Sequence, residues 1–369
     1  MTTNITDLLF EKARKYPEKV AIIHANRSRT FGMLAEKVQV KSQRLTELGI
    51  VKGDRILVFV PMSIPLYECL LSVFCIGAVA VFVDAWADSR RLDYAVELSK
   101  CKAFIGSPKS FLLMLKSAAI RKVPVKLLPS FGRRGRGDPF AKVTACDVDD
   151  PALITFTTGS TGIPKAALRT HAFLLAQHRV LCEEMEMSPN DVDMATLPIF
   201  VLNNLACGAT TLIPDFNPRK PGDVNGGRIL KEVIKYGVTS TAGSPAFYEA
   251  FATAASTNTS TMPLQRLYVG GAAVFPDFAR RLRSAFPKVR IRVLYGSTEA
   301  EPISMVDIDE LAALNMKIDE SGIPAGRVSQ YIDLAIIPLG RHLSRVYSID
   351  EWDALKCPPG VPGEICVAG

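Results

Sequence analysis

The chain is poor in histidine and lacks the cysteine pairs that mark several common classes of protein. Its 369 residues include four histidines, which form no catalytic-triad pattern with serine and aspartate. Its eight cysteines form no C-x-x-C pair, and several lie in apolar runs, where a buried thiol is the usual state. The N-terminus carries charges every few residues and has no apolar signal core. We therefore expect a reduced, cytoplasmic protein.

No apolar run is long enough to predict a membrane span. The most hydrophobic stretch, from Cys69 to Val83, is uncharged, and Glu68 directly precedes it. It is shorter than the roughly 20 residues that a bilayer requires. The stretch instead predicts a buried helix, a break at Gly77 and a buried strand.

The charge balance argues against a nucleic-acid surface. The formal net charge is +7, and the basic residues are scattered instead of forming one stripe. One segment, residues 131–140, concentrates three arginines among glycines. Isolated basic runs are usually exposed, so we expect a solvated loop at the seam between two units. The charge is compatible with a small anionic molecule as the ligand.

Strand-like and helix-like segments alternate through most of the chain. Short apolar runs rich in β-branched and aromatic residues are separated by helix-like segments such as 63–76 and 88–101. Parallel strands need such crossovers, which cover both faces of a sheet, so the pattern predicts an α/β fold. The expected strands lie at 55–60, 78–84, 102–106, 152–156, 193–197, 209–214, 238–242, 265–271 and 289–296.

The same pattern divides the chain into three regions. Residues 1–145 form a first α/β unit, and residues 146–302 form a second. From about residue 303 to residue 369, short strand-like pieces are broken by proline and glycine. This last region is expected to be a small β-rich subdomain.

A glycine-rich stretch, FTTGSTGIPKAALRTH at 156–171, follows one of the expected strands. Past Pro164 a helix is predicted, from about residue 172 to residue 185. A strand, a glycine loop and a helix let backbone N–H groups converge on an anion. Lys165 would add a positive charge. The stretch is not a Walker A loop, which has four residues between its glycines and a lysine directly after the second. From its chemistry alone, the stretch fits a phosphate-binding loop and an ordinary structured turn equally well.

Two later stretches have the position and composition of nucleotide-binding loops. YVGGAAV (268–274) and YGSTEAEP (295–302) lie at the C-terminal ends of expected strands, where open α/β sheets place ligands. With TTGSTGIPK (157–165), their order and wording resemble the adenylate-forming superfamily, which includes acyl-CoA synthetases, fatty acyl-AMP ligases, nonribosomal peptide synthetase adenylation domains and luciferases. The resemblance runs from residues 52–63 to 363–369. It implies two mostly parallel sheets with helices on both faces, plus a small β-rich subdomain.

The resemblance implies ATP and Mg²⁺ as cofactors. In this superfamily a carboxylate attacks the α-phosphate of ATP to give an acyl-adenylate and pyrophosphate, so the protein supplies positioning and charge neutralisation. Lys165 would contact the β- and γ-phosphates. Thr298 would touch the α-phosphate or the acyl carboxylate. Glu299 would hold Mg²⁺, which prefers oxygen ligands.

The other implied contacts surround the phosphates and the adenine. Those on the phosphate side are Thr157, Thr158, Gly159, Ser160, Thr161 and Gly162. Those around adenine are Gly270, Gly271, Ala272, Ala273, Tyr295, Gly296 and Ser297, of which Gly296 would also border the substrate. Tyr295 would stack on the ring, and the alternative is a core aromatic at a strand end. Ala166 and Ala273 replace a usual glycine and a frequent proline, and their small size is expected to keep the geometry.

The acyl chain is expected beside LPIFVLNNLACG, residues 197–208. Phe200 and Leu202 would line a hydrophobic tunnel. Either one of Asn203 and Asn204 faces the substrate or solvent, or the pair caps the following helix. No acidic residue in this segment could pair with an amino group, which favours a fatty or aryl acid over an amino acid.

These features imply ATP-dependent activation of a carboxylic acid, with a medium- or long-chain fatty acid as the substrate and CoA or a carrier-protein thiol as a possible acceptor. Residues 81–92, 197–208 and 295–304 look closest to the branch with fatty-acyl ligases and β-lactone synthetases of olefin biosynthesis. In the lactone-forming reaction a 3-hydroxyl attacks its own adenylate, and no CoA is needed. A peptide-forming adenylation domain and a nucleotide-binding module without turnover are further alternatives.

The chain ends before the superfamily's ribose-binding aspartate, its hinge and its mobile C-terminal domain with the catalytic lysine. We therefore expect residues 1–369 to be the large N-terminal adenylation domain alone. Such a chain would bind ATP and an acyl-adenylate and would turn over poorly.

Overall fold

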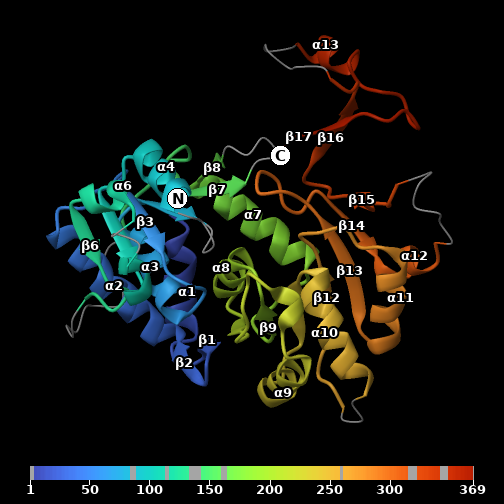
Figure 1. The fold of residues 1–369 in the computed structure, drawn as a ribbon, viewed down its shortest axis with the longest axis horizontal. Coiled ribbons are helices and arrows are strands. Elements are labelled where there is room, and N and C mark those ends of the chain that lie inside the picture. Colours follow the sequence, from blue (N-terminus) through green and yellow to red (C-terminus); the bar gives the residue numbers. More distant parts are fainter. Residues whose placement is uncertain are drawn as a thin grey trace.

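Two large sheets with their covering helices make up most of the protein in a computed structural model (Figure 1). Both sheets are mostly parallel, which confirms the predicted α/β class. The structure describes residues 4–83, 89–112, 116–132, 143–158, 164–257, 261–314, 322–340 and 348–368. Most of the basic segment 131–140 therefore lies outside the described residues.

The first sheet has six strands in the spatial order β6-β5-β3-β4-β7-β8. All neighbours are parallel except β7 and β8. The strands are β3 (Arg55–Phe59), β4 (Val79–Val83), β5 (Ala103–Gly106), β6 (Val125–Leu127), β7 (Pro151–Thr158) and β8 (Pro164–Thr170). The helices between them are α3 (Ile64–Cys75), α4 (Ser89–Ser99), α5 (Pro108–Phe111) and α6 (Ala118–Lys122).

The second sheet has nine strands in the order β15-β14-β13-β12-β11-β9-β10-β1-β2, with antiparallel strands only at its two edges. The strands are β1 (Val20–His24), β2 (Arg27–Thr30), β9 (Val192–Ala195), β10 (Thr210–Ile213), β11 (Ser240–Gly243), β12 (Arg266–Val269), β13 (Arg290–Tyr295), β14 (Ser304–Asp307) and β15 (Arg327–Val328). The remaining helices are α1 (Thr6–Lys15), α2 (Phe31–Glu47), α7 (His171–Glu184), α8 (Pro198–Cys207), α9 (Gly226–Tyr236), α10 (Pro245–Ser256), α11 (Pro276–Ala285), α12 (Ile308–Ala312) and α13 (Ile349–Asp353).

The two sheets do not follow the three expected regions of the sequence. β1 and β2, from the N-terminal region, join the second sheet beside β10. β7 and β8 follow residue 145 and nevertheless pair with β4 of the first sheet. After residue 303, β14 and β15 extend the second sheet, whereas β16 (Asp333–Ile337) and β17 (Glu364–Ala368) form a separate pair that projects from the molecule (Figure 1). The subdomain limits stay a prediction.

The most hydrophobic stretch folds as predicted. It forms the buried end of α3, a turn at Gly77 with φ +68°, and the mostly buried strand β4. Within the described ranges, no helix combines the length and the apolar character needed to cross a bilayer.

The helix predicted after the glycine-rich stretch, at about 172–185, is confirmed as α7, which begins at His171, where Thr170 Oγ1 accepts a hydrogen bond from Phe173 N–H at 3.0 Å. Strand β8, which lies between the loop and this helix, was not predicted. It pairs antiparallel with β7 and places Thr157 opposite Lys165. β8 gave no strand signal because its sequence, PKAALRT, has one β-branched residue and no aromatic residue. Pairing with the open edge of β7 is what makes it a strand.

The second sheet reverses its strand order at β9. From β9 the chain passes through α8 to β10 on one side, and β11 then adds on the other side. Thr196 joins the carboxyl ends of β9 and β11, because its N–H and its hydroxyl both donate to Ala242 O, at 3.3 and 3.0 Å. Open α/β sheets bind ligands at the carboxyl edge beside such a reversal.

Two adjacent glycines at the start of α9 differ in how closely they approach α10. A Cβ on Gly226 would lie 2.0 Å from Ala250 O, whereas a Cβ on Gly227 would meet only Asn225 Oδ1 at 3.5 Å. We expect Gly226→Ala to lower the free energy of unfolding by about 1–3 kcal/mol, as overpacking does. Gly227→Ala is the matched control and should be neutral or stabilising by up to about 1 kcal/mol. Thermal or urea unfolding of both variants measures this, and equal destabilisation would contradict the packing.

Candidate active site

The second and third motif loops lie side by side at the carboxyl edge of the second sheet. They follow β12 and β13, which are parallel neighbours, so both loops leave the sheet at one edge. Gly270 N–H donates to Gly243 O at 3.0 Å, which fixes the start of the first of these loops against β11. Gly271 has φ +78°, and no atom lies within 4 Å of a Cβ built on it. With the exposed Ala272 and Ala273, it forms an open ledge.

Tyr295 ends β13 at this edge with its side chain in solvent contact. It is 41% exposed, which excludes the alternative of a core aromatic. Its backbone is fixed on the side of β14, because it pairs with Ser304 and its carbonyl accepts from Ile303 N–H at 2.8 Å. Stacking of its ring on adenine stays a prediction.

The loop after Tyr295 is a tight turn that presents Glu299 to solvent. Ser297 N–H donates to Ala300 O at 2.8 Å, and Ala300 N–H donates back to Ser297 O at 3.2 Å. A Cβ on Gly296 would lie 3.0 Å from Ala300 O, so the turn is closed by a close backbone approach. Glu299 is exposed and makes no ion pair with a residue that the structure describes. Its carboxylate is therefore open to a ligand.

Arg169, which the sequence analysis did not single out, connects this turn to the glycine-rich hairpin. It lies on β8 and is buried, and its Nε and Nη2 both donate to Thr298 O, with Nε at 3.1 Å. Burial lowers the pKa of the Arg169 guanidinium, and the carboxylates of Glu301 and Glu299 oppose that shift. Burial also raises the pKa of Glu301, which Arg169 opposes. A buried cation thus lies beneath the turn that carries Thr298 and Glu299.

The hairpin itself is described only in part. Gly159, Ser160, Thr161 and Gly162 lie outside the described residues, and only the backbone of Thr157 and Thr158 is described. Lys165 is exposed near the start of β8. Arg169 lies on the same strand and bonds the turn that carries Glu299. Strand β8 therefore connects Lys165 to that turn.

For the two asparagines of the predicted acyl segment, the structure excludes a helix cap and exposure to solvent. Both lie within α8 and are buried, Asn203 at 3% exposure and Asn204 at 0%, so neither caps a helix and neither faces solvent. Asn204 Nδ2 donates to Asp193 Oδ2 at 2.7 Å, and Asn203 Oδ1 lies 2.8 Å from His178 Nδ1. Phe200 is buried in the core beside them. Contact of Asn203 with a substrate stays a prediction, as does a tunnel lined by Phe200 and Leu202.

Asp193 is an acidic group that the sequence reasoning missed. It comes from β9 and lies fully buried beneath α8. Burial raises the pKa of Asp193 to about 6, and the hydrogen bond from Asn204 opposes that shift. Its position in a strand rather than in segment 197–208 explains why the sequence gave no signal.

Comparison with known proteins identifies the family. Residues 9–369 match the family described as AMP-binding enzyme. The chain belongs to this family. Its members are adenylate-forming ligases, so this chain is an acid-activating domain of the adenylate-forming superfamily, as the motifs implied.

Individual relatives of this AMP-binding chain have several activities. An olefin β-lactone synthetase of Stenotrophomonas maltophilia is 30% identical over 99% of this chain and 70% of that protein. A feruloyl-CoA synthase of an Amycolatopsis species is 27% identical, over 97% of this chain and 68% of that protein. The N-terminal subdomain of Klebsiella oxytoca NpsA, solved with 3-hydroxybenzoyl-AMSN, has the same fold. It aligns with a TM-score of 0.76 at 22% identity and covers 100% of this chain and 88% of that one.

The residues present at the carboxyl edge fit the ATP and Mg²⁺ that AMP-binding enzymes use. Gly271 has open space around it, and the exposed ring of Tyr295 ends the strand next to its own, as a site for a planar base requires. Glu299 offers an uncommitted carboxylate, the ligand that Mg²⁺ prefers. Lys165 is an exposed cation on β8, the strand whose Arg169 bonds the turn of Glu299. Tyr295, Glu299 and Lys165 would therefore hold the base, the metal and the phosphates.

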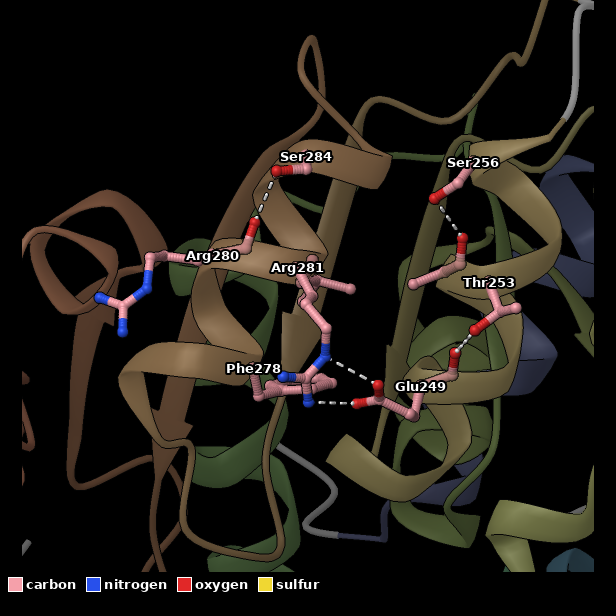
Figure 2. A pocket seen from close by; sticks show the side chains of 9 residues that line it. Glu249, Thr253, Ser256, Phe278, Arg280, Arg281 and Ser284 are labelled. Carbon is pink, nitrogen blue, oxygen red and sulfur yellow. Dashed lines mark hydrogen bonds and ion pairs between the residues drawn. The ribbon is translucent and has the colours of Figure 1, made fainter.

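A pocket of about 310 Å³ lies elsewhere on the AMP-binding domain, between α10 and α11 (Figure 2). Its described lining includes none of the predicted site residues. Arg281 spans it and donates to both carboxylate oxygens of Glu249, at 2.9 and 3.1 Å. Both partners are exposed, and such surface pairs stabilise a protein little. We assign the pocket no role in adenylation.

Ionisation of Asp193 should make the stability of the protein depend on pH. Because its pKa is raised in the folded state, its contribution to stability is complete below its unfolded pKa and is lost as the pH rises through about 6. Between about pH 4 and pH 6 this amounts to about 3 kcal/mol at most. Asp193→Asn keeps an acceptor for Asn204 and should remove this dependence. Unfolding at several pH values compares the two proteins, and identical pH profiles would contradict the assignment.

Proposed function

We propose that this chain forms the adenylation site of an enzyme that activates a 3-hydroxy fatty acid, and that the 3-hydroxyl then takes the acyl group to close a β-lactone. The observation that carries the proposal is the 30% identity to an olefin β-lactone synthetase over 99% of the chain. The feruloyl-CoA synthase, whose name gives CoA as its acceptor, is less similar, at 27% identity. Lactone formation was the alternative in the sequence analysis, and the identity to olefin β-lactone synthetases favours it over transfer to CoA.

The geometry supports the first half of the reaction. A carboxylate oxygen of the acid attacks the α-phosphorus of ATP, and pyrophosphate leaves. The Mg²⁺ ion would neutralise phosphate charge when it is bound. Glu299 would hold that ion. Lys165, on β8, would hold the departing phosphates. Thr298 would orient the reacting carboxylate, because its carbonyl is fixed by Arg169. These residues raise the rate by positioning and electrostatics, and none of them forms a covalent bond.

The acyl segment supports an apolar acid. Helix α8 begins at the carboxyl end of β9, beside the strand-order reversal. Its residues are mainly apolar, and the described acid nearest to it, Asp193, already accepts a hydrogen bond from Asn204 and is fully buried. An acid engaged in this way does not offer a counter-ion to an α-amino group. Amino acids are therefore the poorer substrates.

The closing step needs no group from outside the bound ligand. The oxygen of the 3-hydroxyl attacks the acyl carbon of the adenylate, the bond to the phosphate oxygen of AMP breaks, and the hydroxyl proton goes to solvent. The products are a four-membered lactone and AMP. The acid must therefore carry its hydroxyl on the third carbon.

A panel of acids tests the proposal directly. The protein is incubated with MgATP and either a 3-hydroxy fatty acid, the same acid without the hydroxyl, or an amino acid, each with and without CoA. We expect a product lighter than the 3-hydroxy acid by one water, formed equally well without CoA. The plain fatty acid should give an adenylate that hydroxylamine traps.

The readouts are mass spectrometry of the product and release of pyrophosphate. A CoA thioester as the sole product would contradict lactone formation and leave acid activation intact. Pyrophosphate exchange with amino acids alone would contradict the whole proposal. If turnover is too slow to detect, a thermal shift with MgATP still measures binding, since a ligand at 100 times its Kd stabilises by about 2.7 kcal/mol.

A further inference from the structure

A cluster of two thiols and one imidazole lies between α7 and α8. His178 and Cys182 are four residues apart on α7 and therefore share one face of that helix. Cys207 ends α8 and faces them. One ligand atom from each of the three side chains lies within 4.8 Å of the other two, and the two sulfurs are 2.8 Å apart. No other group of this kind occurs among the residues that the structure describes.

The chemistry of the three side chains points to a particular class of ion. Two thiolates and an imidazole, with no carboxylate, suit a borderline-soft cation that accepts tetrahedral geometry. Zn²⁺ binds sulfur at about 2.3 Å and histidine nitrogen at about 2.0–2.1 Å. Donor atoms within 4.8 Å of one another reach such distances after small side-chain rotations, with the sulfurs moving apart. Sulfur and nitrogen donors do not suit Mg²⁺, which requires oxygen ligands.

A second, independent observation supports a ligand here. Asn203 Oδ1 lies 2.8 Å from His178 Nδ1, and this contact fixes the orientation of the imidazole ring. Histidines that bind metals are usually held in this way by a neighbouring oxygen. Asn203 is 97% buried, since its exposure is 3%, and its Nδ2 has no hydrogen-bond partner in the described structure. A buried amide with an unused donor is costly unless an acceptor completes it, and a water bound to an ion at this site would be such an acceptor.

We propose that His178, Cys182 and Cys207 bind a single Zn²⁺ ion, with the fourth position left to water. Each cysteine loses its proton to solvent as its sulfur binds, so two thiolates balance the charge of the ion and two protons are released. The imidazole binds as the neutral ring. No bond is oxidised or reduced.

This zinc site goes beyond the proposed adenylation and is distinct from the Mg²⁺ position at Glu299. It would join α7, which follows the glycine-rich hairpin through β8, to α8, which carries the predicted acyl segment. Zinc would therefore fix the relative position of the two elements that flank the substrates. We assign it a structural role.

The test measures metal content and stability rather than activity. The protein is purified with a thiol reductant, stripped with a chelator and titrated with Zn²⁺ alone. We expect uptake of one Zn²⁺ ion per chain and a higher melting temperature. Co²⁺ in place of Zn²⁺ should give sulfur-to-metal charge-transfer absorption. Cys182→Ser and Cys207→Ser should abolish that absorption and the stoichiometric uptake, whereas Cys357→Ser, at a half-buried cysteine elsewhere, should bind like the parent.

Two further variants keep the test decisive if a cysteine variant fails to fold. His178→Gln keeps both thiols, and Asn203→Leu keeps all three ligands, so each should weaken Zn²⁺ binding by about 10-fold or more while circular dichroism stays unchanged. Reduced, folded protein that takes up no Zn²⁺ would overturn the proposal. So would equal uptake by Cys182→Ser, or a Cys182–Cys207 disulfide as the stable state in the presence of Zn²⁺.

Discussion

The hydrogen bonds from Arg169 to the Thr298 carbonyl hold together a site that the chain builds from two separate sheets. The glycine-rich hairpin belongs to the first sheet, and the loops after β12 and β13 belong to the second. Burying a guanidinium is costly, so its N–H groups must find fixed acceptors. Thr298 O accepts from Nε and from Nη2, and the carboxylates of Glu301 and Glu299 oppose the loss of charge. The residues proposed for the phosphates and for the metal could act on one ligand only while this junction persists.

The sequence predicted the repeating architecture well because the signals are local. Buried parallel strands such as β4 are short apolar runs, and the loops after β12 and β13 carry recognisable motifs. Strand β8 could not be predicted in this way, since it depends on the unpaired edge of β7 rather than on its own composition. The helix predicted at about 172–185 is confirmed as α7, and only the strand before it was missed.

In the candidate site, too, the sequence predicted only those residues that a local motif marks. Glu299, Lys165 and Tyr295 were singled out through motifs. The structure places Tyr295 and Glu299 at one sheet edge, and Lys165 lies on β8, whose Arg169 bonds the turn at that edge. Partners far apart in the sequence had no local signature. Asp193 bonds Asn204 eleven residues away, and Arg169 reaches Thr298 across 129 residues. Cys182 and Cys207 are 25 residues apart and come together only because α7 and α8 pack against each other. Such pairs follow from topology, which a pattern of residues does not specify.

The geometry of the Arg169 junction is the most direct test of this account. Arg169→Lys keeps the positive charge but replaces a planar pair of donors with a single ammonium. We expect affinity for MgATP, measured by calorimetry, to fall about 10-fold, which is the loss of about 1.4 kcal/mol of charged hydrogen bonding. The melting temperature without ATP should change little, and Arg179→Lys, at an exposed arginine of α7, should bind like the parent. Unchanged MgATP affinity in folded Arg169→Lys would contradict a site assembled by this contact.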